Sequence, residues 1–360
     1  MTVPTAAGER RQNFLSPHHR PRNSWFAGRA AILARARRSG QDSLLFAGRT
    51  AVIVAVDLNP SLDRTLTVER LEPATVTRAQ AVRLDPGGKG LNVARALSTW
   101  GLPVLAFALL GGGTGATIAR LLEQEEVPCE PVPIEGESRS NIVIIDQAQG
   151  TYIKVNEPGP IVTLEELDAL EDRILARAER GDLWVFSGRL PLGAPLDTYA
   201  RLIHLVQSRG ARAFLDASGK AFALGVAARP YLVKSNQSEA GELLGRPVES
   251  AESAVAAIRE LWSRGVKAVA ITRGAEGAVI GCHSTIVEAR PPALDVVAPV
   301  GTGDATMAAL AWGILEGLRP LEMARLAVAA GTATALVEGT GMASLEQVQA
   351  MRGRLEVRVL

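Results

Sequence analysis

The chain has 360 residues, of which 47% are hydrophobic and 21% charged, and its formal net charge is +1. This is ordinary globular composition for one large domain or two small ones, and nothing in the overall charge suggests a polyanion as partner. Cys129 and Cys282 are too few and too far apart for a disulfide framework or a metal cluster, and no apolar run approaches the roughly 20 residues of a membrane span. We therefore expect a cytoplasmic protein without a membrane partner.

Residues 1–49 differ in composition from the rest of the chain. They contain nine arginines, no lysine and two acidic residues, and only the segment 25–38 could form a short basic helix. Three interpretations remain open: a disordered tail, a targeting or nucleic-acid-binding arm, and an upstream segment that is foreign to the natural product. Since charge runs are usually solvated, the sequence favours a disordered basic extension, and a nucleic-acid partner is not expected.

From Thr50 onward, apolar β-rich runs alternate with helical periodicity, which predicts a mostly parallel sheet covered by helices on both faces. The predicted strands are nearly continuous in apolar residues and cover 51–56, 104–110, 183–186, 213–216, 231–234 and 268–272. The predicted helices cover 91–100, 116–125, 164–179, 196–208 and 251–263. Segments 62–82 and 140–155 are strand-like without intervening helices, which predicts a small accessory sheet.

The first glycine cluster spans residues 85–95 and reads Asp-Pro-Gly-Gly-Lys-Gly-Leu-Asn-Val-Ala-Arg. Its glycines would let a ligand approach the backbone closely, while Lys89 supplies a cation and Asn92 an amide on the first helical turn. It is not a Walker A loop, because glycine follows Lys89 where Ser or Thr is required. A tight turn before a helix explains these residues equally well. A second cluster, 110–116, fits a dinucleotide fingerprint poorly and lacks the later acidic residue.

The third cluster, residues 299–304, reads Pro-Val-Gly-Thr-Gly-Asp and opens a well-patterned helix. A glycine turn at a helix start exposes unpaired N–H groups at the positive end of the helix dipole, where phosphate binds readily. Asp304, in the first turn, could orient a hydroxyl that attacks phosphorus or accept its proton. Taken alone, the hexapeptide favours a simple turn with Asp304 as a helix cap.

Together, the clusters at 85–95 and 299–304 resemble the paired signatures of the PfkB family of carbohydrate kinases in the ribokinase-like superfamily. The resemblance extends from about residue 51 to the C-terminus and is strongest to the branch with 1-phosphofructokinase and tagatose-6-phosphate kinase. It implies a three-layer α/β/α ribokinase-like sandwich over residues 50–360. It also implies a small β-sheet lid, formed by about 59–84 and 139–156.

The resemblance implies a set of site residues. The catalytic group would comprise the Asp304 carboxylate and the anion-binding turn Gly301, Thr302 and Gly303. Segments such as Leu-Asn-Pro-Ser-Leu-Asp at 58–63 and Ser-Arg-Ser-Asn at 138–141 carry the sugar-binding group, which is Asp63, Arg78, Gly87, Gly88, Lys89, Asn92, Arg139 and Asn141. The nucleotide would contact Lys234, Asn236, Thr272, Gly274 and Gly277, and Glu239 with Asn236 would hold Mg²⁺ through water.

The resemblance implies transfer of the γ-phosphoryl group of ATP to a ketohexose monophosphate, with fructose 1-phosphate as the first choice of acceptor. Tagatose-6-phosphate kinase and 6-phosphofructokinase are the alternatives among enzymes. A non-catalytic sugar-phosphate or nucleotide sensor on the same fold is the alternative from another class. Arg189 stands where the family usually has Ser, which leaves the phosphosugar open. The resemblance also implies a homodimer through the lid, because exposed lid sheets in this family often pair between subunits, which also removes a sheet edge.

Overall fold

The structure is a computed structural model that describes residues 45–46, 49–294 and 300–360. The predicted N-terminal extension and its helix at 25–38 lie almost entirely outside the described residues. At the end of that segment, β1 (Leu45–Phe46) pairs with β2 (Arg49–Thr50) in a two-stranded sheet. Among the described residues, no helix combines the length and apolar character that a membrane crossing requires.

A ten-stranded sheet in the order β16-β15-β14-β13-β12-β11-β10-β3-β6-β7 forms the middle of the molecule. Neighbours from β7 to β13 are parallel, whereas the edge from β13 to β16 is antiparallel. All the predicted strands are present, and the antiparallel edge and β7 were not predicted. The strands are β3 (Ile53–Asp57), β6 (Val104–Leu110), β7 (Cys129–Pro133), β10 (Leu183–Ser187), β11 (Arg212–Asp216), β12 (Leu232–Asn236), β13 (Ala268–Thr272), β14 (Ala278–Cys282), β15 (Thr285–Arg290) and β16 (Glu356–Val359).

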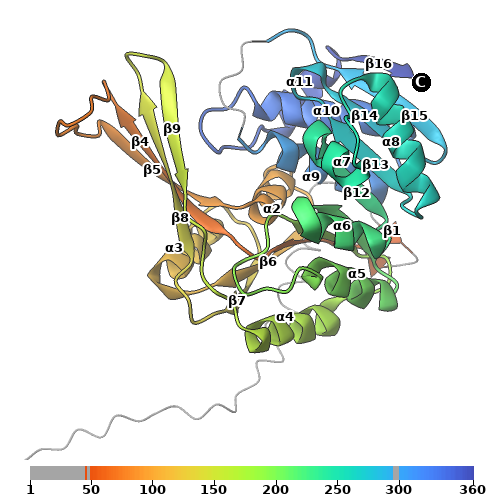
Figure 1. Ribbon diagram of the computed structural model, residues 1–360, viewed down its shortest axis with the longest axis horizontal. Helices are drawn as coiled ribbons and strands as arrows, with labels where there is room; N and C mark the ends of the chain where they lie inside the picture. Colours follow the sequence, from red (N-terminus) through yellow and green to blue (C-terminus); the bar gives the residue numbers. More distant parts are fainter. Residues whose placement is uncertain (1–44, 47–48, 295–299) are drawn as a thin grey trace, which may run out of the picture.

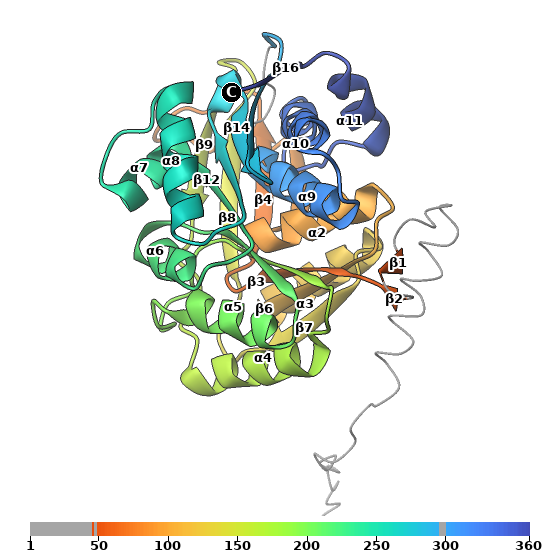
Figure 2. The same ribbon diagram turned by 90° about the vertical axis from the view of Figure 1, so that its right-hand side faces the viewer.

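Helices cover both faces of this sheet, as Figures 1 and 2 show. Because successive side chains of a strand point to opposite faces, Ile53 and Ala55 join one hydrophobic core and Val54 and Val56 the other. The first core packs under α2 (Lys89–Thr99), α3 (Gly112–Gln124), α9 (Thr302–Leu315), α10 (Pro320–Thr334) and α11 (Leu345–Arg352). The second packs under α4 (Leu164–Arg177), α5 (Thr198–Ser208), α6 (Gly219–Ala227), α7 (Gln237–Leu244) and α8 (Ala251–Ser263). The three-layer α/β/α prediction is therefore confirmed.

A separate four-stranded sheet in the order β5-β4-β8-β9 projects from the body at the upper left of Figure 1. It consists of β4 (Ser61–Val68), β5 (Ala81–Gly87), β8 (Arg139–Asp146) and β9 (Thr151–Asn156), so the predicted accessory sheet is present. The strand register places Asp63 and Asn141 side by side on one face. The opposite face, called the apolar face below, carries the exposed Arg64 and the apolar residues Leu66, Val82, Leu84, Ile142, Ile144, Ile153 and Val155.

Candidate active site

Polar side chains gather where the parallel strands of the main sheet end. In the register of β3, β10 and β11, Ser187 pairs with Asp57 on one side and with Asp216 on the other. The apolar interior of each strand stops at these residues, and all of them are buried. Carboxyl ends of parallel strands meet at one edge of a sheet, which is the usual place for a ligand crevice in open α/β folds.

The two glycine motifs that the sequence places far apart are in direct contact at this edge. Asn92, in the first turns of α2, donates a hydrogen bond from Nδ2 to Oδ2 of Asp304 at 2.8 Å. Asn92 Oδ1 accepts a hydrogen bond from Nη1 of the buried Arg95 at 3.3 Å, which fixes the orientation of the amide. Burial raises the pKa of Asp304 to about 6, although the positive charge of Lys89 opposes the change.

Asp216 joins two lysines that come from different elements. Its Oδ1 accepts a hydrogen bond from Lys89 Nζ at 2.8 Å, and its Oδ2 accepts one from Lys234 Nζ at 2.6 Å. Burial alone would raise the pKa of Asp216, but Lys234 and Lys89 hold it below its ordinary value. A Cβ built on Gly303 would lie 3.0 Å from Lys234 Nζ, so this ammonium group lies against the start of α9.

Three helices begin at glycine-rich turns, but their N-termini differ in what covers them. At α2, the N–H groups of Gly90 and Leu91 donate to the carboxylate of Asp57. At α3, the first N–H groups donate to the carboxylate of Glu137. At α9, the residue before the helix is Gly301, and the ammonium group of Lys234 lies against the first turn. The starts of α2 and α3 already hold carboxylates of the chain, so the start of α9, beside a cation, suits a phosphate better.

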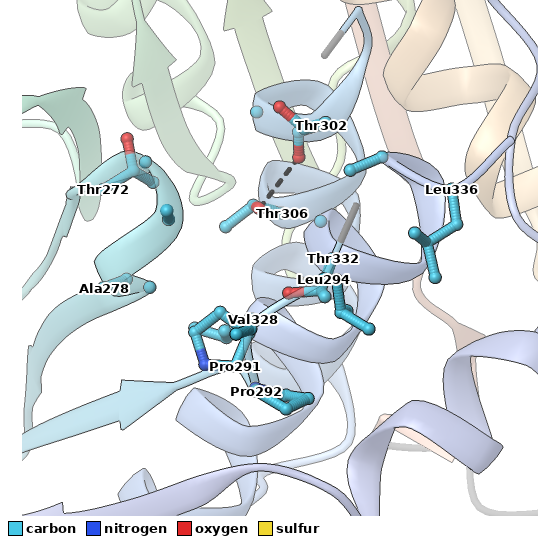
Figure 3. A pocket seen from close by; sticks show the side chains of 17 residues that line it. Thr272, Ala278, Pro291, Pro292, Leu294, Thr302, Thr306, Val328, Thr332 and Leu336 are labelled. Atoms are coloured by element: carbon cyan, nitrogen blue, oxygen red, sulfur yellow. Dashed lines mark hydrogen bonds between the residues drawn. The ribbon is translucent and has the colours of Figure 1, made fainter. Parts of the chain in front are cut away.

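A pocket of about 440 Å³ adjoins the start of α9. The predicted nucleotide residues Thr272, Gly274 and Gly277 line it, together with Thr302 and Gly303 of the third glycine cluster. Most of the remaining wall is apolar and comprises Ala275, Ala278, Pro291, Pro292, Ala293, Leu294, Val328, Ala335 and Leu336. In Figure 3, Thr302 and Thr306 of α9 lie between Thr272 on one side and Leu336 on the other. An apolar slot that ends at a helix N-terminus suits a flat ring joined to phosphates.

A second group of predicted residues lies at the base of the small sheet. The carboxylate of Asp63 accepts hydrogen bonds from Ser61 Oγ and Asn141 Nδ2, each at 2.8 Å. Arg139 donates to Asn141 Oδ1 at 3.3 Å and, through Nε, to the backbone oxygen of Asn59 at 3.1 Å. A Cβ on Gly87 would lie 2.4 Å from the carboxyl carbon of Asp63. Gly87 thus joins this group to the turn that carries Lys89.

Not every predicted site residue joins these groups. Arg78 is exposed in the loop beyond the last β4–β5 pair, Thr67 with Ala81. From Asp63 to Thr67, β4 advances by about 13 Å, so the structure does not bring Arg78 to the Asp63 group. Asn236 and Glu239 form a capping box at the start of α7, in which each side chain accepts the other residue's backbone N–H.

Two site residues were absent from the sequence prediction, namely Asp57 and Asp216. Both are buried carboxylates that end apolar strands, in the runs Val-Ala-Val-Asp and Ala-Phe-Leu-Asp. That position was the available signal, because an acidic residue directly after a doubly buried strand lies at the ligand-binding edge of the sheet. A Cβ on Gly88 would lie 2.3 Å from Asp57 Oδ2, so the lack of a side chain there makes room for a protein carboxylate. Contact between the backbone of Gly88 and a sugar stays a prediction.

The sequence profile of the pfkB family carbohydrate kinases matches residues 50–347. The 1-phosphofructokinase of Rhodobacter capsulatus is 39% identical over 283 residues, which cover 78% of this chain and 89% of that protein. The 1-phosphofructokinase of Xanthomonas campestris pv. campestris is 36% identical over 281 residues, covering 77% and 88%. A crystal structure of phosphofructokinase-2 from Escherichia coli with substrates and products has a TM-score of 0.80 and 31% identity, covering 84% and 98%.

Proposed function

The chain belongs to the pfkB family of carbohydrate kinases, and from this premise we propose that it transfers the γ-phosphoryl group of ATP to fructose 1-phosphate. The product would be fructose 1,6-bisphosphate. The observation that carries the proposal is the hydrogen bond from Asn92 to Asp304. Through this bond the aspartate of the glycine cluster 299–304 contacts the helix that follows the glycine cluster 85–95. Relatives named 1-phosphofructokinase, at 30–39% identity over most of the chain, favour fructose 1-phosphate as the acceptor.

On the sugar side, Asp63 and Asn141 would bind hydroxyl groups of the acceptor. The hydrogen bonds of Arg139 to Asn59 and Asn141 hold its guanidinium at the same place, where its planar donors suit the phosphate that the sugar already carries. The attacking hydroxyl would lie beside Asp304, which is ionised at neutral pH because its pKa is about 6. Asp304 would orient that hydroxyl and accept its proton late in the transfer.

On the nucleotide side, the pocket beside Thr272 would hold the base and the start of α9 the phosphates. Lys234, held against Gly303 by Asp216, would add positive charge where the transferred group becomes more negative. Among the described residues, no group of three or more His, Cys, Asp or Glu side chains could hold a metal by itself. That fits Mg²⁺, which keeps several waters and uses few protein ligands, and Glu239 with Asn236 would hold it through water. Mg²⁺ would supply neutralisation of the phosphate charge.

The small sheet would act as a lid that limits access of water to the transferred group. Its apolar face supports a homodimer, since Val82, Ile153 and Val155 are each about half exposed in the single chain. The two cysteines, neither in a disulfide, support a cytoplasmic location.

Arg189 is exposed directly after Gly188, whose built Cβ lies 3.8 Å from Lys89 Cβ. Because a cation at the edge of the site bears on which phosphosugar binds, substrate choice needs a direct test.

A panel of phosphosugars in a coupled ADP-release assay tests the proposed substrate. We expect the highest kcat/KM for fructose 1-phosphate, and lower values for tagatose 6-phosphate and fructose 6-phosphate. A higher value for either alternative would change the substrate assignment while leaving the kinase assignment in place. Binding of nucleotide and sugar phosphate without any ADP release would instead favour a non-catalytic sensor.

A further inference from the structure

Asp57 is a buried carboxylate that has no role in the phosphoryl transfer proposed above. It ends β3 and is 2% exposed. Its Oδ2 accepts hydrogen bonds from the backbone N–H groups of Gly90 at 2.9 Å and Leu91 at 3.2 Å, and its Oδ1 accepts one from Asn59 at 3.1 Å. All of these donors belong to the main chain. Asp57 therefore takes, at the start of α2, the place that a bound anion would take at an open helix start.

The glycine turn before α2 is shaped around this carboxylate. Gly88 has a φ of 117°, and a Cβ there would lie 2.3 Å from Asp57 Oδ2. A Cβ on Gly90 would lie 2.5 Å from the backbone oxygen of Val56 and 2.8 Å from Asp57 Cβ. Larger residues would push the turn away from β3. The turn can therefore approach the strand end closely enough for both N–H groups of α2 to reach Asp57.

The same turn carries two groups of the transfer site. Lys89 reaches Asp216 at 2.8 Å, and Asn92 reaches Asp304 at 2.8 Å. Both contacts extend from the first turns of α2, directly beside the N–H groups that Asp57 holds. Because a helix start moves as a unit, a shift of this turn would displace both contacts together.

We propose that Asp57 is a positioning residue of the transfer site, which fixes the start of α2 so that Lys89 meets Asp216 and Asn92 meets Asp304. This inference rests on the proposed kinase function. Burial raises the pKa of Asp57 to about 6, and the nearby charge of Arg139 acts in the opposite direction. The fold thus carries a buried charge at neutral pH, at a cost in stability. We assign to this charge the role of holding the start of α2 through hydrogen bonds from main-chain N–H groups.

The variant Asp57→Asn tests the proposal with little change of shape. An amide offers a single acceptor oxygen and turns an NH₂ group toward backbone N–H groups, so the start of α2 should shift. We expect kcat to fall by roughly 10-fold to 100-fold, as small misplacements of reacting groups do. KM for ATP should remain unchanged, because the base pocket is built from β13, α9, α10 and the segment after β15.

Asp182→Asn is the matched control. Asp182 is also a buried carboxylate, 3% exposed, and it accepts hydrogen bonds from the backbone N–H groups of Val52 and Glu179. It precedes β10 and therefore lies at the opposite edge of the main sheet from the site. Its replacement can lower the thermal unfolding temperature, but kcat per folded molecule should stay at the wild-type value.

Asp57→Ser provides a second variant if the amide prevents folding, because its hydroxyl can accept one of the N–H groups in a smaller volume. We expect the same pattern of lower kcat with unchanged KM for ATP. A wild-type kcat in a folded Asp57 variant, or an equal loss in Asp182→Asn, would overturn the inference alone. A wild-type enzyme that phosphorylates no sugar of the panel would overturn the proposed function and this inference with it.

Discussion

Asp304 and Asp216 are buried carboxylates of one site, yet their pKa values move in opposite directions. Two ammonium groups contact Asp216 and keep its pKa low, whereas Asp304 receives a single amide hydrogen bond from Asn92. Asp304 is 6% exposed, and burial raises its pKa to about 6. Asp216 therefore stays charged and holds the two lysines. The pKa of Asp304 lies closer to neutral pH, so this carboxylate can gain and lose a proton.

Asp304→Asn should separate catalysis from stability. Removing the proton acceptor should lower kcat by roughly 10²-fold to 10⁴-fold, while nucleotide binding persists because the pocket is intact. The pKa of Asp304 in the folded chain, about 6, lies above its ordinary 3.8, so folding disfavours the ionised form. Above pH 6 this costs the wild type up to about 3 kcal/mol of unfolding free energy, and the cost disappears as the pH falls below 4.

We therefore expect the ligand-free Asn variant to unfold at a higher temperature than the wild type at neutral pH, with the difference shrinking on acidification. Thermal unfolding across pH, together with nucleotide titration, measures both effects. Retained turnover in the variant would remove Asp304 from the mechanism. A variant less stable than the wild type at neutral pH would contradict the raised pKa.

The pH dependence of turnover gives an independent measure of the same group. In the proposed mechanism the ionised form of Asp304 accepts the proton, so kcat should fall about tenfold per unit as the pH drops below about 6. Lys89 and Lys234 lower this pKa, whereas Asp216 raises it. Replacing Lys89 by Met removes the largest lowering influence, so the acid limb of the remaining activity should move to higher pH. An unmoved limb would assign it to another group.

At the scale of elements, α9 and α10 together set the position of the glycine turn at the start of α9, where we propose that phosphate binds. A Cβ on Gly331 of α10 would lie 2.5 Å from Thr306 Oγ1 and 3.1 Å from the backbone oxygen of Thr302. Thr306 already donates a hydrogen bond to that oxygen at 2.9 Å, so the first turn of α9 has little room to yield. The close packing of α10 thus limits movement of the first turn of α9.

Gly331→Ala should therefore push the start of α9 out of place. We expect KM for ATP to rise by about tenfold, which corresponds to about 1.4 kcal/mol of lost binding. Gly313→Ala is the matched control, because a Cβ there would meet the flexible side chain of Met323 at 2.9 Å, toward the other end of α9. Steady-state kinetics with thermal unfolding distinguishes the two. Equal effects on KM would show that general loosening of the helix pair, and not the turn, is responsible.

The sequence predicts those helices and strands that a local residue pattern marks. Doubly buried parallel strands appear as apolar runs, so they were found to within about two residues. The hairpin of β14 and β15 was missed because its turn, His283-Ser284, has positive φ values of 48° and 65° without the usual Gly or Asn. The resemblance named Asp304 and Asn92, but their contact joins positions 212 residues apart, which no local pattern encodes.

At the scale of the whole molecule, the small sheet presents its two faces to different surroundings. One face holds Asp63 and Asn141 at the site, and the apolar face lies on the opposite side. On the apolar face, β8 and β9 carry Ile142, Ile144, Ile153 and Val155 in two adjacent rows, with Ile153 49% and Val155 55% exposed. Two such faces packed together would bury both sets of side chains, and each lid would then be held by its partner.

Ile153→Glu tests this arrangement, because a carboxylate in a packed and mostly apolar interface loses its hydration. Sedimentation velocity should show a dimer for the wild type and a monomer for the variant. Lys154→Glu is the control: its neighbouring position on β9 points to the other face, so the dimer should persist. If dimers also hold the lids in place, Ile153→Glu should raise KM for the phosphosugar more than KM for ATP, since Asp63 lies in the sheet and the base pocket does not. A monomeric wild type, or a dimer that tolerates Glu at 153, would show that this face serves another purpose.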